Sequence, residues 1–173
     1  MEFFDDYVIF DLETTGLDPK TDKIIEIGAC KYINNELVDE FSVLINPNIS
    51  ISDTITSITG ITNDMVSNCE TIDSVLPKFL DFIGNLPLLA HNNTFDLSFI
   101  EENMNNLSLG KLSNQMVDTL LLSRKYLTHM YNHKLETLKK YYNIKEVSHR
   151  AVGDCHTTNS VYQEIKKKAK VTN

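Results

Sequence analysis

The sequence has 173 residues, of which 42% are hydrophobic and 23% charged, and its formal net charge is −8. This length suits a single domain over residues 1–173, and the apolar fraction is too high for a disordered chain. The chain starts with acidic residues, unlike a signal peptide, and it has no apolar run near the ~18 residues of a membrane span, so we expect a cytoplasmic protein without membrane contact. Its three cysteines are scattered and form no CxxC pair, which argues against a disulfide framework or a thiolate metal site.

Short apolar runs in the first part of the chain predict strands at residues 7–12, 24–33 and 37–45. The Asn34-Asn35 pair between the last two is typical of a hairpin turn. Helices and strands then alternate: we expect helices at 73–83, 95–104, 120–126, 135–142 and 154–168, and strands at 88–90 and 116–117. This order predicts an α/β sheet with helices on both sides.

Two acidic residues, Asp11 and Glu13, come at the end of the first predicted strand. Side chains two apart on a strand point to the same face, about 6–7 Å apart. Carboxylates held that close repel each other unless one is protonated or a cation lies between them. Oxygen ligands of this kind suit Mg²⁺ or Mn²⁺, whereas the alternative is an ordinary acidic strand end that runs into a turn.

Two further acids, Asp96 and Asp154, each come near the start of a predicted helix. Asp96 shares its helix face with Phe99 and Ile100, and apolar residues likewise continue the stripe below Asp154. Both acids are therefore expected on the packed side, where an unpartnered acid is costly. The four acids can converge on one point, where two divalent ions would balance their charge.

A loop histidine and a loop arginine precede Asp154. In isolation His149 is an ordinary solvated side chain, but beside a metal site it is a candidate general base, because its pKa lies near working pH. Arg150 could contact a phosphate or an acid, and its spacing does not decide between them.

Three segments resemble the motifs of the DEDD 3′→5′ exonucleases, in the subtype whose fifth residue is histidine. They are Phe10 to Pro19 (FDLETTGLDP), Ala90 to Asp96 (AHNNTFD) and His149 to Asp154 (HRAVGD). The segments Ile58 to Met65 and Asn132 to Leu135 also look like this family. The motif-bearing core covers about residues 7–169. The likeness is greatest to the proofreading exonucleases of bacterial replicative polymerases.

The resemblance implies a ribonuclease H-like fold, with a five-stranded mixed sheet flanked by helices. It also implies that Asp11, Glu13, Asp96 and Asp154 bind two Mg²⁺ (or Mn²⁺) ions and that His149 activates the attacking water. The substrate-binding residues it implies are Thr14, Thr15 and Gly16 by the terminal 3′-hydroxyl, Ile58 and Thr59 against the last base, and His91, Asn92 and Phe95 at the second nucleotide.

By this resemblance the protein hydrolyses single-stranded or frayed DNA 3′ ends to nucleoside 5′-monophosphates, in proofreading or repair, and a DNA polymerase is a candidate partner. The distribution of charge agrees with DNA binding only in the second part of the chain. Residues 1–110 carry 4 basic and 19 acidic side chains, whereas residues 111–173 carry 12 basic and 5 acidic ones. The basic side chains of the second part could border the path of the DNA strand. One alternative is an RNA-directed exonuclease, although oligoribonucleases usually have Met in place of Thr14. The other is an inactive nucleic-acid-binding module, which would be expected to lack one of the five residues.

Overall fold

The computed structural model describes residues 3–145 and 150–172. A five-stranded mixed sheet lies at its centre, with strand order β3-β2-β1-β4-β5. The strands are β1 (Tyr7–Thr14), β2 (Ile24–Ile33), β3 (Glu36–Leu44), β4 (Leu88–Ala90) and β5 (Met116–Asp118). β1 to β3 form an antiparallel meander, and β4 and β5 add to β1 in parallel. The predicted mixed sheet is confirmed.

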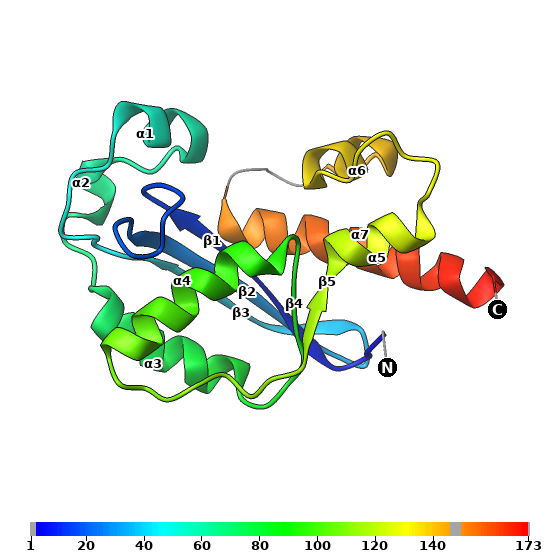
Figure 1. The fold of residues 1–173 in the computed structure, drawn as a ribbon, viewed down its shortest axis with the longest axis horizontal. Coiled ribbons are helices and arrows are strands. Elements are labelled where there is room, and N and C mark those ends of the chain that lie inside the picture. The colour runs from blue at the N-terminus through cyan, green and yellow to red at the C-terminus, as the bar shows by residue number, and fades with distance from the viewer. Residues whose placement is uncertain (1–2, 146–149, 173) are drawn as a thin grey trace.

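Helices cover both faces of this sheet (Figure 1). Their bounds are α1 (Asp53–Thr59), α2 (Asn63–Val66), α3 (Ile72–Ile83), α4 (Asn93–Asn106), α5 (Thr119–Tyr126), α6 (Leu135–Tyr141) and α7 (Ala151–Thr172). α3 and α4 pack on one face, and α5, α6 and α7 pack on the other. In the described ranges, no helix has both the length and the apolar character that a membrane crossing needs.

Alternation along β1 divides the core into two layers. Val8, Phe10 and Leu12 lie in the layer under α3 and α4, whereas Tyr7 and Ile9 lie in the layer under α7. Because successive side chains on a strand point to opposite faces, the uninterrupted apolar run of β1 fills both layers. A strand with this pattern must be buried on both sides, as the sequence predicts.

The hairpin between β2 and β3 turns at Asn34 and Asn35, which have φ angles of 51° and 64°. Two consecutive positive φ angles are typical of the type I′ turn that Asn tolerates well. This predicted turn is confirmed. The structure adds α1 and α2, to which the sequence assigned no helix, and both lie at the end of the sheet where β1 terminates (Figure 1).

Candidate active site

The site begins at the carboxyl end of β1. Asp11 and Glu13 continue the strand face of Tyr7 and Ile9, so their side chains point toward α7. The apolar run ends where the strand passes the start of that helix. The two acids therefore replace core residues at the margin of the sheet, on the same face, as the sequence predicts.

A glycine in β2 allows α7 to come close to these acids. Gly28 pairs with Asp11 across the sheet. A Cβ atom at Gly28 would lie 2.5 Å from the carbonyl carbon of Ala151 and 2.5 Å from the backbone nitrogen of Val152. Only a residue without a side chain fits there, so the first turn of α7 lies directly on β2 and carries Asp154 toward β1.

Asp11, Glu13 and Asp154 each offer an oxygen, and these three atoms lie within 4.8 Å of one another. Asp96 joins the same end of β1 from α4. Its side chain is 3% exposed, and its Oδ1 accepts a hydrogen bond of 3.1 Å from the backbone N–H of Leu12. Leu12 separates Asp11 from Glu13, so that bond fixes α4 beside both acids. The structure thus brings three of the four predicted acids together and places the fourth, Asp96, at the same strand end.

Crowding of these acids changes their protonation. Burial, followed by repulsion from Asp96 and Asp154, raises the pKa of Asp11 well above its ordinary value. Burial and then repulsion from Asp154 raise the pKa of Glu13 to about 7. Burial raises the pKa of Asp96 to about 8, although the bond from Leu12 opposes this. Without a cation, the cluster therefore retains protons near neutral pH.

This donor set fits divalent cations with a preference for oxygen. All four acids supply carboxylate oxygens, the ligand type that Mg²⁺ and Mn²⁺ select. A divalent ion among Asp11, Glu13 and Asp154 would relieve the repulsion that, together with burial, raises the pKa values of Asp11 and Glu13, and it would take the place of the retained protons.

An ion pair between a half-exposed arginine and a buried acid fixes the start of α7. The carboxylate of Glu26, in β2, accepts hydrogen bonds from Arg150 (2.8 Å from Nη2) and from the backbone N–H of Ala151 (3.1 Å). Glu26 is 1% exposed, and it pairs with Glu13 across the sheet. The structure thus assigns Arg150 to an acid. Glu26 was not predicted as a site residue, although a charged residue inside an otherwise apolar strand could have indicated it.

Three of the predicted substrate-binding residues lie at the end of β1 and in the loop that follows it. The Thr14 hydroxyl donates to the carbonyl of Gly16 (2.6 Å), and Thr15 Oγ1 both donates to Asp22 (3.3 Å) and accepts from the backbone N–H of Lys23 (2.9 Å). A Cβ atom at Gly16 would collide with the carboxylate of Asp22. These residues shape a closed turn beside the acids, and both hydroxyls are engaged within it.

The predicted base contacts, Ile58 and Thr59, lie at the end of α1 and differ in exposure. Ile58 is 51% exposed, whereas Thr59 is 5% exposed. The Thr59 hydroxyl donates to the carbonyl of Ile55 (3.0 Å) and accepts from the N–H of Ile61 (3.1 Å). Ile58 therefore offers an apolar surface to a ligand, while the Thr59 side chain stabilises the end of its own helix.

Of the residues predicted to bind the second nucleotide, two line a pocket and the third packs against the core. His91 and Asn92 line a pocket with Arg124, His133 and Lys134. The imidazole of His91 is fixed there by Thr119 (2.9 Å) and by the carbonyl of His133 (2.8 Å), and burial lowers its pKa.

Phe95 instead packs against Phe99, with ring centroids 5.1 Å apart, and contacts the α3–α4 core layer. It is only partly buried, so it belongs to both the core and the surface next to Asp96. The candidate base His149 lies outside the described residues.

Comparison with known proteins agrees with this geometry. The Exonuclease family profile matches residues 8–162. The chain is 45% identical over 170 residues, or 97% of its length, to the DNA polymerase III PolC-type protein of Clostridium perfringens, and 42% identical over 95% of its length to that of Listeria welshimeri. It spans 12% and 11% of the lengths of these two relatives.

Solved structures share the fold. Exonuclease X in complex with 5′ overhanging duplex DNA superposes with a TM-score of 0.75 at 26% identity, covering 95% of this chain and 93% of that one. E. coli Exonuclease I in complex with an oligonucleotide superposes with a TM-score of 0.82 at 17% identity, covering 98% of this chain and 42% of that one. The second likeness concerns the fold alone. The chain therefore belongs to the exonuclease family.

Proposed function

We propose that this chain, as a single domain, removes nucleotides from single-stranded or frayed DNA 3′ ends and releases nucleoside 5′-monophosphates, using two Mg²⁺ or Mn²⁺ ions. The observation that carries the proposal is the cluster of Asp11, Glu13 and Asp154 oxygens within 4.8 Å, with Asp96 bonded to the same strand end. Such ions would offset phosphate charge and stabilise the charge that develops as the phosphodiester bond breaks.

The protein residues would bind the cations, accept a proton from the attacking water and position the chain end. The four acids hold the cations, and their spacing fixes where the terminal phosphate can lie. His149, which the sequence places five residues before Asp154, takes a proton from the attacking water. The turn at Thr14 and Gly16 forms the wall beside the chain end.

Two surfaces support binding of a strand without sequence preference. Exposed Ile58 provides an apolar contact for the terminal base, because stacking tolerates any base. The pocket with Arg124 and Lys134 supplies positive charge beside His91 and Asn92, and phosphate contacts carry no sequence information. Arg124 and Lys134 belong to residues 111–173, the basic part of an otherwise acidic chain, whereas His91 and Asn92 come from the acidic part.

The relatives support a proposal about the biological setting. Proteins at 42–45% identity are named as DNA polymerases of the PolC type, so we propose proofreading or repair beside a polymerase in the cytoplasm.

The test uses matched 3′-labelled and 5′-labelled oligonucleotides of DNA and RNA, with the Asp11→Asn variant as the inactive control. The proposal expects label to leave the 3′ end first as mononucleotide, and single strands or mismatched ends to be digested faster than paired ends. Circular single-stranded DNA should resist digestion, since it has no end. Faster digestion of RNA would favour the RNA-directed alternative, and digestion of the circle would contradict an exonuclease that needs a 3′ end.

A further inference from the structure

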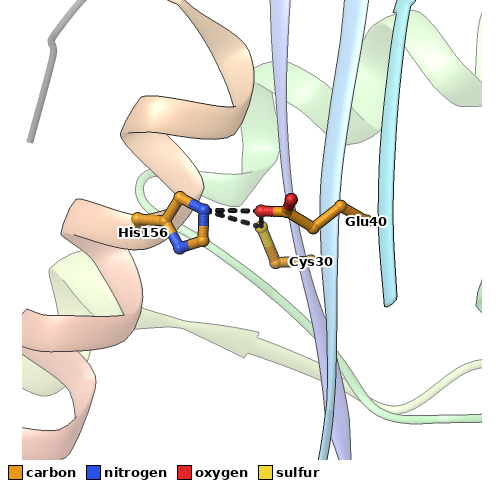
Figure 2. A group of neighbouring side chains, drawn as sticks. All are labelled: Cys30, Glu40 and His156. Atoms are coloured by element: carbon orange, nitrogen blue, oxygen red, sulfur yellow. Dashed lines mark hydrogen bonds and ion pairs between the residues drawn. The ribbon is translucent and has the colours of Figure 1, made fainter. Parts of the chain in front are cut away.

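A second group of metal-ligating side chains lies on the α7 face of the sheet, away from the four acids. Cys30 in β2 and Glu40 in β3 are register partners, and His156 projects from α7 toward both (Figure 2). Cys30 Sγ lies 3.8 Å from Glu40 Oε1 and 3.9 Å from His156 Nε2. His156 Nε2 lies 2.6 Å from Glu40 Oε1. The three ligand atoms therefore lie within 4.8 Å of one another.

We propose that Cys30, Glu40 and His156 form a second cation site, which takes Zn²⁺ or a similar borderline-soft divalent ion. One sulfur, one imidazole nitrogen and one carboxylate oxygen are all ligand types that Zn²⁺ accepts. A thiolate is a poor ligand for Mg²⁺, so this site would not compete for the ion that the four acids prefer. Three protein ligands leave a fourth position for water or another ligand.

The distances are close to those of a zinc site. Tetrahedral bonds of about 2.3 Å to sulfur and about 2.0–2.1 Å to nitrogen and oxygen place the sulfur about 3.6 Å from each of the other ligands. The observed 3.8 and 3.9 Å need only small contractions. The 2.6 Å hydrogen bond between His156 and Glu40 must open to about 3.3 Å as an ion takes the place of its proton. Side-chain rotation is sufficient for this change.

The surroundings support a ligand role for His156. Its Nδ1 lies 3.5 Å from the Tyr32 hydroxyl, so the other ring nitrogen has a polar partner while Nε2 faces the cluster. Metal-binding histidines are usually oriented by such a second contact. Access is also provided, because the side chains of His156 and Glu40 are 28% and 44% exposed, whereas Cys30 is buried. One thiolate and one carboxylate would balance a divalent charge.

An ion at this site would connect α7 to β2 and to the edge strand β3. His156 follows Asp154 by two residues on α7, so the proposed cation site would lie close along this helix to the cluster of acids. The inference does not depend on the proposed substrate, because the cluster shares no side chain with the four acids.

The direct test is titration of the reduced full chain with Co²⁺, which gives a near-ultraviolet charge-transfer band only when a thiolate is a ligand. The band should appear in the wild type, disappear on addition of Zn²⁺, and be absent in Cys30→Ser. It should persist in Cys69→Ser and Cys155→Ser, which retain all three ligands. It should also persist in Asp11→Ala/Asp96→Ala, which disables the catalytic cluster.

Because Cys30 is buried, Cys30→Ser could lose the band simply by misfolding, and two further variants control for this. His156→Gln and Glu40→Gln alter partly exposed side chains, and each should weaken Co²⁺ binding by about tenfold or more. A wild type without the band, or a band unchanged in Cys30→Ser or in both of these variants, would overturn the proposal. Mg²⁺-dependent digestion of DNA by the same wild-type preparation separates this result from a failure of the proposed function.

Discussion

At the scale of single residues, the four acids hold more negative charge than a small volume tolerates. Burial, together with repulsion from neighbouring acids, raises the pKa values of Asp11 and Asp96. Charge of this density is stable only with protons or cations, and this requirement predicts how the activity responds to metals and to loss of an acid.

We expect no turnover in EDTA, recovery with Mg²⁺ or Mn²⁺, and little activity with Ca²⁺, whose longer bonds and looser geometry would not align the reacting groups. Asp96→Asn should lower the rate by orders of magnitude while the fold persists, because the substitution removes charge from a crowded cluster. Asp81→Asn, an exposed acid on α3, serves as the control and should leave the rate unchanged. Rates and circular dichroism spectra of both variants check this, and rapid digestion in EDTA would contradict a cation-dependent site.

A second prediction at this scale concerns His149. If it is the general base, His149→Gln should retain the cations and slow the chemical step by roughly 10²–10⁴-fold. The wild-type rate should rise with pH as the imidazole loses its proton, and the variant should lack that step. Single-turnover rates across pH at saturating Mg²⁺ measure both effects. Equal rates and profiles would show that His149 is an ordinary loop residue.

At the scale of secondary-structure elements, the site depends on how the first turn of α7 is attached to β2. Gly28 permits the close approach, and Glu26 fixes it through Arg150 and the N–H of Ala151. Neither Gly28 nor Glu26 is one of the four acids, yet both determine where Asp154 lies. We therefore regard Glu26 as a positioning residue.

The two contacts of Glu26 can be separated by substitution. Glu26→Gln retains an oxygen for the Ala151 N–H but loses the charge that pairs with Arg150, whereas Glu26→Ala loses both contacts. The Mg²⁺ concentration for half-maximal rate should rise in both, more in Glu26→Ala, by about 10–100-fold, which is typical when support of a metal ligand is lost. Glu36→Gln, on the exposed start of β3, is the matched control. A shift in maximal rate alone would argue against a role in cation binding.

At the scale of the whole molecule, the clustered acids lower the free energy of unfolding of the metal-free protein once they ionise. The folded-state pKa values of Glu13 and Asp96 are raised to about 7 and about 8, from ordinary values of 4.5 and 3.8. The folded state thus binds more protons than the unfolded state between these limits. Linkage then requires that the free energy of unfolding decrease as pH rises.

We expect the metal-free protein to lose stability as the pH rises from about 4 through about 8, and the double variant Glu13→Gln/Asp96→Asn to lose less. Thermal unfolding in EDTA at several pH values measures this difference. Mg²⁺ should raise the unfolding midpoint of the wild type most at the alkaline end, where the acids are ionised. A midpoint in EDTA that rises equally with pH in both proteins would contradict the cluster as described.

The succession of strands and helices along the chain could be predicted from the sequence, and the four acids could be singled out as candidates. Period-2 and period-3.6 patterns are local, and β2 and β4 have the predicted bounds. The short helices α1 and α2 were missed, because seven and four residues give too few turns for a periodic signal, and their ends depend on caps such as Ser52 and Thr62.

Contacts between residues far apart in the chain depend on the tertiary structure. Arg150 reaches Glu26 across 124 positions, and His156 reaches Cys30 across 126, and no local pattern records such pairings. Read as a sequence, Cys30 lacked a nearby cysteine partner and argued against a thiolate metal site. Register between β2 and β3 and the close packing of α7 on Gly28 place Glu40 and His156 beside it instead. A ligand set depends on distances in space, and the fold alone sets those distances.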